Sequence, residues 1–136
     1  MSDKNSTLTW LWMEEVWNNG SKEAIEEMLH EHAIVHGIEG ITERGPKGFK
    51  DFYHSFRDQF PEVHVDVQSV VCEGNFESSL CHVTATNDKG KQVNFGGMTM
   101  VRIENGKIME SWNNFDFQGM YQQLGFKMVP AEAETA

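Results

Sequence analysis

Long apolar runs are missing from this 136-residue sequence. No stretch approaches the roughly 18 consecutive apolar residues that a membrane-spanning helix needs. The first five residues, Met1 to Asn5, carry neither the basic start nor the apolar run of a secretory signal. We therefore expect a cytoplasmic protein with no membrane partner.

Positive charge is also scarce. The chain has 11 Lys and Arg residues against 21 Asp and Glu residues, and its basic residues form no cluster longer than a pair. Nucleic acids and anionic lipid surfaces are bound through clustered Lys and Arg side chains. The composition therefore predicts no nucleic-acid partner.

Motifs for several kinds of chemistry are absent as well. The sequence has no Gly-x-Ser-x-Gly motif of a serine nucleophile, and its glycines are spaced too widely for a phosphate-binding loop. Its six histidines show no metal-ligand spacing, so we expect no metal site. Two cysteines, Cys72 and Cys81, flank a predicted hairpin and could pair across it. Reduced thiols are the favoured interpretation, because a chain of this length folds without a disulfide.

Helical periodicity dominates the first half of the chain. Apolar residues recur at helical spacing over residues 7–17, 22–31 and 46–60, with a short strand expected at 33–38. The third helix carries an aromatic stripe, whose rings can pack in a core or form the wall of a pocket. The stripe consists of Phe49, Phe52, Tyr53, Phe56 and Phe60.

The second half of the chain alternates apolar and polar residues, the pattern of half-buried strands. Strands are expected at residues 63–72, 80–86, 93–103 and 107–115. Asn105-Gly106 predicts a two-residue hairpin turn, which sets the register of the last two strands. That register predicts these opposed pairs: Ile103 with Ile108, Val101 with Glu110, Thr99 with Trp112, Gly97 with Asn114, and Phe95 with Asp116.

The two faces of this hairpin differ in composition, because opposed residues share a face. One face is predicted to carry Asp116 together with two aromatic rings, an amide and a hydroxyl, from Phe95, Trp112, Asn114 and Thr99. The other face is predicted to carry Met98, Met100 and Met109, a mixture too apolar for an ordinary solvated face. We expect this Met-rich face to form a homodimer.

The order of elements predicts an α+β domain. Helices with one short strand among them precede long antiparallel strands, whose curved sheet would wrap the helices and leave a cavity at its concave face. Gly96-Gly97 in mid-strand favours a sharp bend there. We expect one domain over residues 1–130 and a disordered tail over residues 131–136.

Three segments resemble a known family. They are Gly-Pro-Lys-Gly-Phe at 45–49, Met-Val-Arg-Ile-Glu-Asn-Gly-Lys-Ile at 100–108, and Asp-Phe-Gln-Gly at 116–119 followed by Gln-Leu-Gly at 123–125. Over roughly residues 8–127 the sequence resembles the SnoaL-like polyketide cyclases of the nuclear-transport-factor-2-like (NTF2-like) superfamily. The resemblance implies a cone-shaped α+β barrel with N-terminal helices packed in the concavity of a curved, mostly antiparallel sheet. It also implies catalysis without a cofactor, with Asp116 as general acid/base.

One position departs from the family pattern. Thr99 stands where the characterised cyclases carry a histidine, and a threonine cannot shuttle a proton near neutral pH as imidazole can. The same fold also hosts isomerases, epoxide hydrolases and dehydratases. These reactions therefore stay open beside the cyclase reaction.

Asp116 is the centre of the catalytic hypothesis. It lies between Phe115 and Phe117, and an apolar setting raises the basicity of a carboxylate that takes a proton from carbon next to a carbonyl. The hypothesis is an enzyme that closes a ring in a small, apolar carbonyl compound by an intramolecular aldol step. The predicted substrate pocket consists of Trp112, Asn114, Thr99, Phe95, Phe56 and, at the cavity mouth, His36.

Each of these residues has a structural alternative. Asp is favoured immediately before a helix, so Asp116 can be the N-cap of a helix at residues 117–124. Trp112 and Phe95 can be core residues, and Asn114 can bond to nearby backbone. The alternative function is then a non-catalytic module that binds a small molecule in the same cavity or works through its sheet.

Overall fold

One sheet of five strands is the frame of the molecule, and the computed structural model describes residues 3–132. The strands are β1 (Leu29–His36), β2 (Glu62–Glu73), β3 (Phe76–Thr86), β4 (Gln92–Glu104) and β5 (Lys107–Phe115). Their order is β1-β5-β4-β3-β2; β1 runs parallel to β5, and the other neighbours are antiparallel. The sheet is open, with β1 and β2 at its edges.

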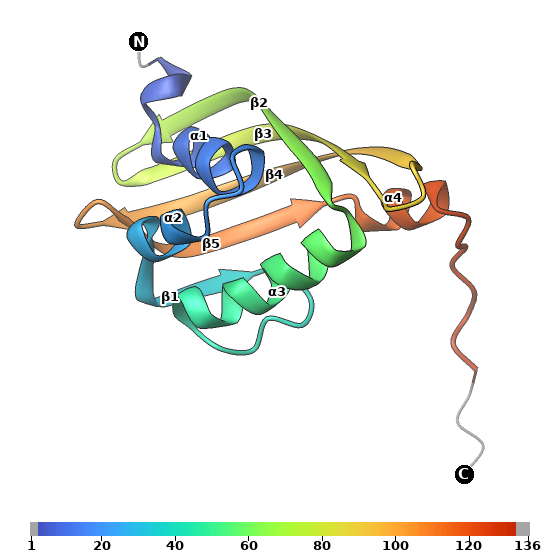
Figure 1. Cartoon of the computed structure of the whole chain (residues 1–136). Coiled ribbons are helices and arrows are strands. Elements are labelled where there is room, and N and C mark those ends of the chain that lie inside the picture. The colour runs from blue at the N-terminus through green and yellow to red at the C-terminus, as the bar shows by residue number, and fades with distance from the viewer. Residues whose placement is uncertain (1–2, 133–136) are drawn as a thin grey trace.

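The helices are α1 (Leu8–Trp12), α2 (Lys22–Met28), α3 (Gly45–Gln59) and α4 (Phe117–Gln123). Figure 1 shows α1, α2 and α3 together on one side of the sheet and α4 beyond the end of β5. The large buried side chains of this helical layer meet the inward-facing side chains of β2, β3 and β4 in one core. The arrangement confirms the predicted α+β fold, with helices covering one face of a mostly antiparallel sheet.

The first predicted helix differs from a regular α-helix. After α1 the chain continues as a π-helix, η2 (Met13–Asn18), in which Asn19 N donates to Glu14 O. Such segments are rare and occur frequently at functional sites. The second helix ends at Met28, earlier than predicted, because Leu29 already begins β1 and pairs with Ile108.

A bulge in β5 makes the predicted hairpin register wrong from Val101 onward. Ile103 lies opposite Ile108 as expected, but the next pair is Arg102 with Glu110, so that Met109 has no partner in β4. The observed pairs are then Val101 with Ser111, Met100 with Trp112, Thr99 with Asn113, Met98 with Asn114, and Gly97 with Phe115. A one-residue shift moves every later side chain to the opposite face.

Charge explains why the bulge is favourable. Without it, Glu110 would share the inward face with Val101, which is buried, and an unpaired carboxylate there would lose its hydration. In the bulged register Glu110 faces outward and accepts a hydrogen bond from Arg102 Nη2 at 3.3 Å.

The structure also bears on the two cysteines, on membrane crossing and on the C-terminal tail. Cys72 and Cys81 are free thiols, one exposed and one buried. No helix among residues 3–132 is long and apolar enough to cross a membrane. Residues 131 and 132 have no regular structure, and the rest of the predicted disordered tail, residues 133–136, lies outside the described residues.

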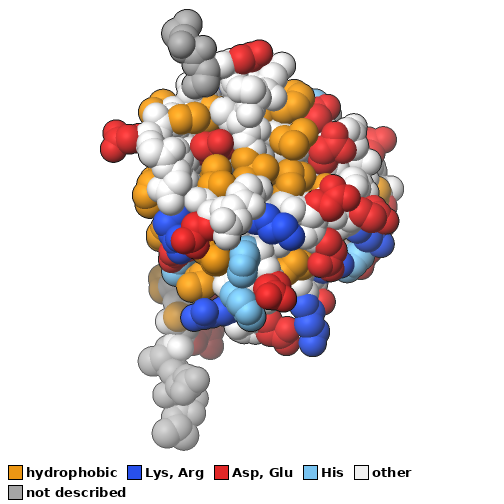
Figure 2. All heavy atoms as spheres, turned by 90° about the vertical axis from the view of Figure 1, so that its left-hand side faces the viewer, with side chains coloured by type: hydrophobic (Ala, Val, Ile, Leu, Met, Phe, Trp, Pro, Cys, Tyr) orange, Lys and Arg blue, Asp and Glu red, His pale blue; other side chains and the backbone are white. Residues whose placement is uncertain are grey.

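Acidic side chains gather along one side of the face shown in Figure 2.

Candidate functional site

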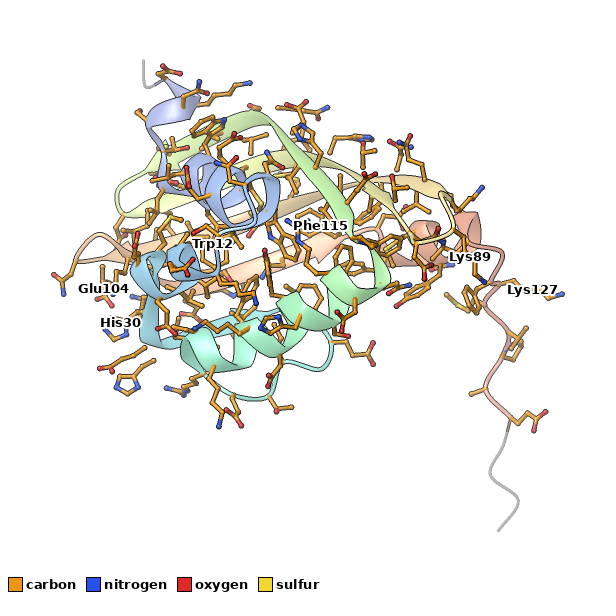
Figure 3. All side chains as sticks on the ribbon, viewed as in Figure 1. Trp12, His30, Lys89, Glu104, Phe115 and Lys127 are labelled. Carbon is orange, nitrogen blue, oxygen red and sulfur yellow. The ribbon has the colours of Figure 1, made fainter. Side chains whose placement is uncertain are left out.

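A cavity of about 70 Å³ opens between the helical layer and the concave face of the sheet. Its walls are almost entirely apolar. They are formed by Trp12, Met13, Trp17, Ile38, Phe49, Phe52, Phe56, Val63, Val65, Val83, Phe95, Asn113, Phe115 and Phe117. Figure 3 shows Trp12, from α1, and Phe115, from β5, in the space between the helices and the sheet.

Aromatic rings of the helical layer form one wall. Helical spacing places Phe49, Phe52 and Phe56 on the same side of α3. Trp12 meets the edge of Phe49 with ring centroids 5.0 Å apart, and Trp17 meets Phe56 at 5.6 Å. Edge-to-face packing of this kind holds large rings in fixed orientations. The wall is therefore built from mutually packed aromatic rings. One of them, Trp17, belongs to the π-helical segment η2.

The opposite wall depends on a glycine in β4. Phe115 lies directly across from Gly97, and a β-carbon added to Gly97 would overlap the Phe115 ring. The absent side chain thus leaves room for the ring to lie over the β4 backbone and line the cavity. Gly97 was predicted to mark a bend; the structure shows this second role.

Among the described residues that line the cavity, Asn113 is the only one with an amide, hydroxyl or charged side chain. Its Nδ2 donates to the backbone oxygen of His36 at 2.9 Å and to Ser111 Oγ at 3.1 Å. Its Oδ1 accepts from Thr99 Oγ1 at 2.8 Å. Just after β1, Gly37 passes close to the backbone of Asn113 in β5. A side chain at Gly37 would strike the Asn113 carbonyl, so this close approach requires glycine.

A second cavity of about 30 Å³ is also bordered by Asn113. Thr99, Ser111 and Asn113 all border it, together with apolar residues such as Leu29 and Ile108. Thr99 is 4% exposed and Ser111 8% exposed, so their hydroxyls lie in the interior. The three polar side chains form a hydrogen-bonded row at the smaller cavity, and Asn113 also borders the larger one.

Two of the predicted pocket residues, Phe56 and Phe95, line the larger cavity, and Thr99 borders the smaller one. Trp112 and Asn114 do not lie inward as their predicted pairing required. They oppose Met100 and Met98, which are exposed on the outer face of the sheet. The bulge at Met109 is the physical reason for this correction.

The side chain of His36 also lies on the outer face. Its ring stacks on Trp112 with centroids 5.5 Å apart, and its Nε2 lies 2.7 Å from Glu110 Oε2. The hydrogen bond to His36, with help from Arg102, lowers the pKa of the Glu110 carboxyl below its ordinary value. His36 contributes to the cavity region through its backbone oxygen, which holds Asn113.

Asp116 is exposed and is the N-cap of α4, the structural alternative considered for it. Its Oδ1 accepts a hydrogen bond from Gly119 N at 2.9 Å, and its backbone N donates to Gly96 O. Asp116 is not among the cavity-lining residues, but both of its neighbours, Phe115 and Phe117, are. The carboxylate therefore lies beside the cavity, and its role as acid/base stays a prediction.

The sequence contains one signal for the inward-facing residues of β5, which the predicted register placed on the outer face. Pairing Glu110 with Arg102, opposite charges on adjacent strands, requires one extra residue in β5 and turns Ser111, Asn113 and Phe115 inward. The inward role of Trp12 and Trp17 had no such signal, because it depends on the packing of distant segments.

Among residues 3–132, no three His, Cys, Asp or Glu side chains come together as a metal site would require.

Comparisons with known proteins agree with this architecture. Residues 7–124 match the family model described as SnoaL-like polyketide cyclase. The chain belongs to the SnoaL-like polyketide cyclase family. The predicted NTF2-like cone, with helices in the concavity of a curved sheet, is therefore confirmed as its fold class.

Solved structures show the same fold. A candidate polyketide cyclase from Bacillus cereus has a TM-score of 0.80 and 24% identity over 94% of this chain and 87% of its own. IdmH from Streptomyces antibioticus, also a candidate polyketide cyclase, has a TM-score of 0.77 and 23% identity over 91% of this chain and 100% of its own. A candidate polyketide cyclase from Acidithiobacillus ferrooxidans has a TM-score of 0.79 and 25% identity over 92% of this chain and 96% of its own. Comparison with curated protein sequences gave no match.

Proposed function

We propose that this SnoaL-like protein binds a small, largely apolar carbonyl compound in its larger cavity and acts on it by cofactor-independent acid/base catalysis. The apolar cavity, with its single amide from Asn113, is the observation that carries the proposal. Concave, apolar sites with a few polar groups are typical of small-molecule binding. The candidate base is Asp116, which lies between two residues of the cavity wall.

The proposed chemistry begins with a proton transfer. The Asp116 carboxylate takes a proton from the carbon next to a carbonyl, and the electron pair of that C–H bond forms an enolate. The enolate carbon then attacks a second carbonyl carbon of the same molecule, which forms a C–C bond and closes a ring. Asp116 returns the proton to the new alkoxide. Isomerisation or dehydration would share the first step and differ in where the proton is returned.

Binding would change the surroundings of Asp116. A ligand that fills the cavity as far as Phe115 and Phe117 would cover this end of β5 and remove water from it. Loss of water strengthens the interaction between a carboxylate and a nearby acidic C–H group. The hydrogen bond from Gly119 N would hold the carboxylate in one orientation during the transfer.

Hydrogen–deuterium exchange of acetophenone tests the first step without a known natural substrate. The protein should accelerate the loss of the methyl proton signal in deuterium oxide. Asp116→Asn should abolish the acceleration, because an amide cannot accept the proton, while acetophenone binding stays within about tenfold. Unchanged acceleration in Asp116→Asn would refute Asp116 as the base.

A non-catalytic binding module is the second candidate function. The observation in its favour is that Asp116 is exposed and already bonded as a helix cap. This function predicts that acetophenone binds in the cavity but that neither the unaltered protein nor Asp116→Asn accelerates exchange. The same experiment therefore separates the two candidates.

A homodimer through the outer face of the sheet is also part of the proposal. Leu80, Met98 and Met100 are 42%, 52% and 38% exposed on this face, whereas Met109 is the partly buried bulge residue of β5. Contiguous exposed apolar side chains of this kind are typical of interfaces. Sedimentation at high micromolar concentration should show a dimer that Met98→Glu disrupts and Leu11→Glu, an exposed change on the helical side, does not.

A further inference from the structure

The hydrogen bonds of Asn113 fix the orientation of its amide, which borders both cavities. The backbone oxygen of His36 can only accept a hydrogen bond, so the group 2.9 Å from it must be the NH2 of Asn113. The second hydrogen of that NH2 is directed at Ser111 Oγ. Both donor positions of the amide are therefore used within the protein.

The oxygen of the same amide retains one free acceptor position. A carbonyl oxygen has two lone-pair sites, and Thr99 Oγ1 donates to one of them at 2.8 Å. The single hydrogen of the Thr99 hydroxyl is used in this bond. The row formed by Thr99, Asn113 and Ser111 thus offers the ligand a hydrogen-bond acceptor at Asn113, and no donor from that amide.

This arrangement has a consequence for the ligand. A ligand oxygen that carries only lone pairs, as in a ketone or an ether, gains no hydrogen bond from Asn113, whereas a hydroxyl can donate to Asn113 Oδ1. We infer that the cavity selects compounds that bear a hydroxyl group, anchored at Asn113. The inference rests on the proposed function and extends it: the carbonyl that reacts lies toward Asp116, and the hydroxyl lies deeper along β5.

The position of Asn113 agrees with this division. Asn113 and Phe115 point to the same side of β5, and Asp116 begins the turn into α4. Three residues of extended strand span about 10 Å. A compound that reaches both Asn113 and Asp116 is therefore longer than a single six-membered ring and extends out of the cavity of about 70 Å³ toward the exposed Asp116.

Phenol and toluene test the anchor, because they have the same shape and differ in one hydroxyl. Their affinities are measured by calorimetry for the unaltered protein and for Asn113→Leu, which removes the acceptor at nearly constant volume. The ratio of phenol to toluene affinity should fall about tenfold in Asn113→Leu. Use of this ratio cancels the different hydration of the two probes, since it is the same for both proteins.

Thr99→Val is the second variant, and it keeps the test valid if Asn113→Leu fails to fold. Valine matches threonine in shape and removes the hydroxyl that occupies one lone pair of Asn113 Oδ1. The phenol-to-toluene ratio should therefore be retained or increased in Thr99→Val. Acetophenone, which offers only an acceptor, should show the same affinity for Thr99→Val as for the unaltered protein within about twofold.

The outcomes separate the inference from the function on which it rests. Binding of both probes with a ratio that Asn113→Leu leaves unchanged, or that Thr99→Val lowers, would overturn the hydroxyl anchor while the cavity remains a binding site. Absence of binding by phenol, toluene and acetophenone would overturn the proposed function, and the anchor with it.

Discussion

The ring of Phe115 occupies the space that a side chain at Gly97 would need, so the cavity wall of β5 exists because β4 has a glycine at that position. The relationship joins two residues on neighbouring strands. It makes the shape of the cavity sensitive to a single methyl group.

Replacing Gly97 by Ala should destabilise the protein by about 1–3 kcal/mol, the usual cost of overpacking a well-packed site. The methyl group would push Phe115 away from β4 and alter the cavity. Chemical denaturation measures the loss of stability. Gly96→Ala is the matched control, because a β-carbon there would meet only Cys81 O at an ordinary 3.6 Å. Equal stabilities of the two variants would contradict this account of the cavity wall.

Two substitutions at Asp116 separate its capping role from its chemical role. Asn caps a helix about as well as Asp, whereas Ala caps poorly. Thermal unfolding should therefore show little change in Asp116→Asn and a loss of about 1 kcal/mol in Asp116→Ala. A similar large loss in both variants would show that the charge, and not the hydrogen bond to Gly119 N, stabilises α4.

Glu77 should be important for the start of α1. Its carboxylate accepts hydrogen bonds from Leu8 N at 3.1 Å, Thr9 N at 2.8 Å and Thr9 Oγ1 at 3.0 Å. Hydrogen bonds to a charged group are worth more than neutral ones, so Glu77→Ala should cost about 2 kcal/mol. Glu73→Ala, an exposed change in the same hairpin, is the control. Equal unfolding midpoints for the two variants would contradict the assignment.

Glu110 should make stability depend on pH in the acid range. Its folded-state pKa is lowered, first by the hydrogen bond with His36, from an ordinary value of 4.5. A lowered carboxyl pKa adds stability that is fully present above the unfolded pKa and is lost as the pH falls through the folded pKa. Glu110→Gln should therefore melt at a lower temperature than the unaltered protein at neutral pH, and the gap should shrink well below pH 4.5. A gap that does not depend on pH would refute this linkage.

The sequence was sufficient for the architecture. The helix that carries the aromatic stripe, α3, and the strands β2 and β4 follow from local patterns and appear close to their predicted bounds. β3 begins at Phe76, before its predicted start at Leu80, and the bulge interrupts the alternation of β5. Periodicity within one segment is set by the backbone, so it can be read without knowledge of the partner segments.

The candidate site was less predictable, because it depends on the pairing of segments. A turn at Asn105-Gly106 fixes the first pairs of the hairpin, but the bulge at Met109 lies beyond that local signal. Because of this shift, Asn113 and Phe115 lie on the inner face, where Trp112 and Asn114 were predicted. Only the cross-strand pairing of Arg102 with Glu110 carried information about it.

The tryptophan side chains provide the most direct test of the cavity as a binding site. Two of the four, Trp12 and Trp17, line the larger cavity, and Trp10 and Trp112 do not. Titration with acetophenone, followed by the four indole N–H signals in NMR spectra, should shift the Trp12 and Trp17 signals to saturation and leave those of Trp10 and Trp112 in place. No shift at Trp12 and Trp17, or a saturating shift confined to Trp112 on the outer face, would contradict ligand binding in the cavity.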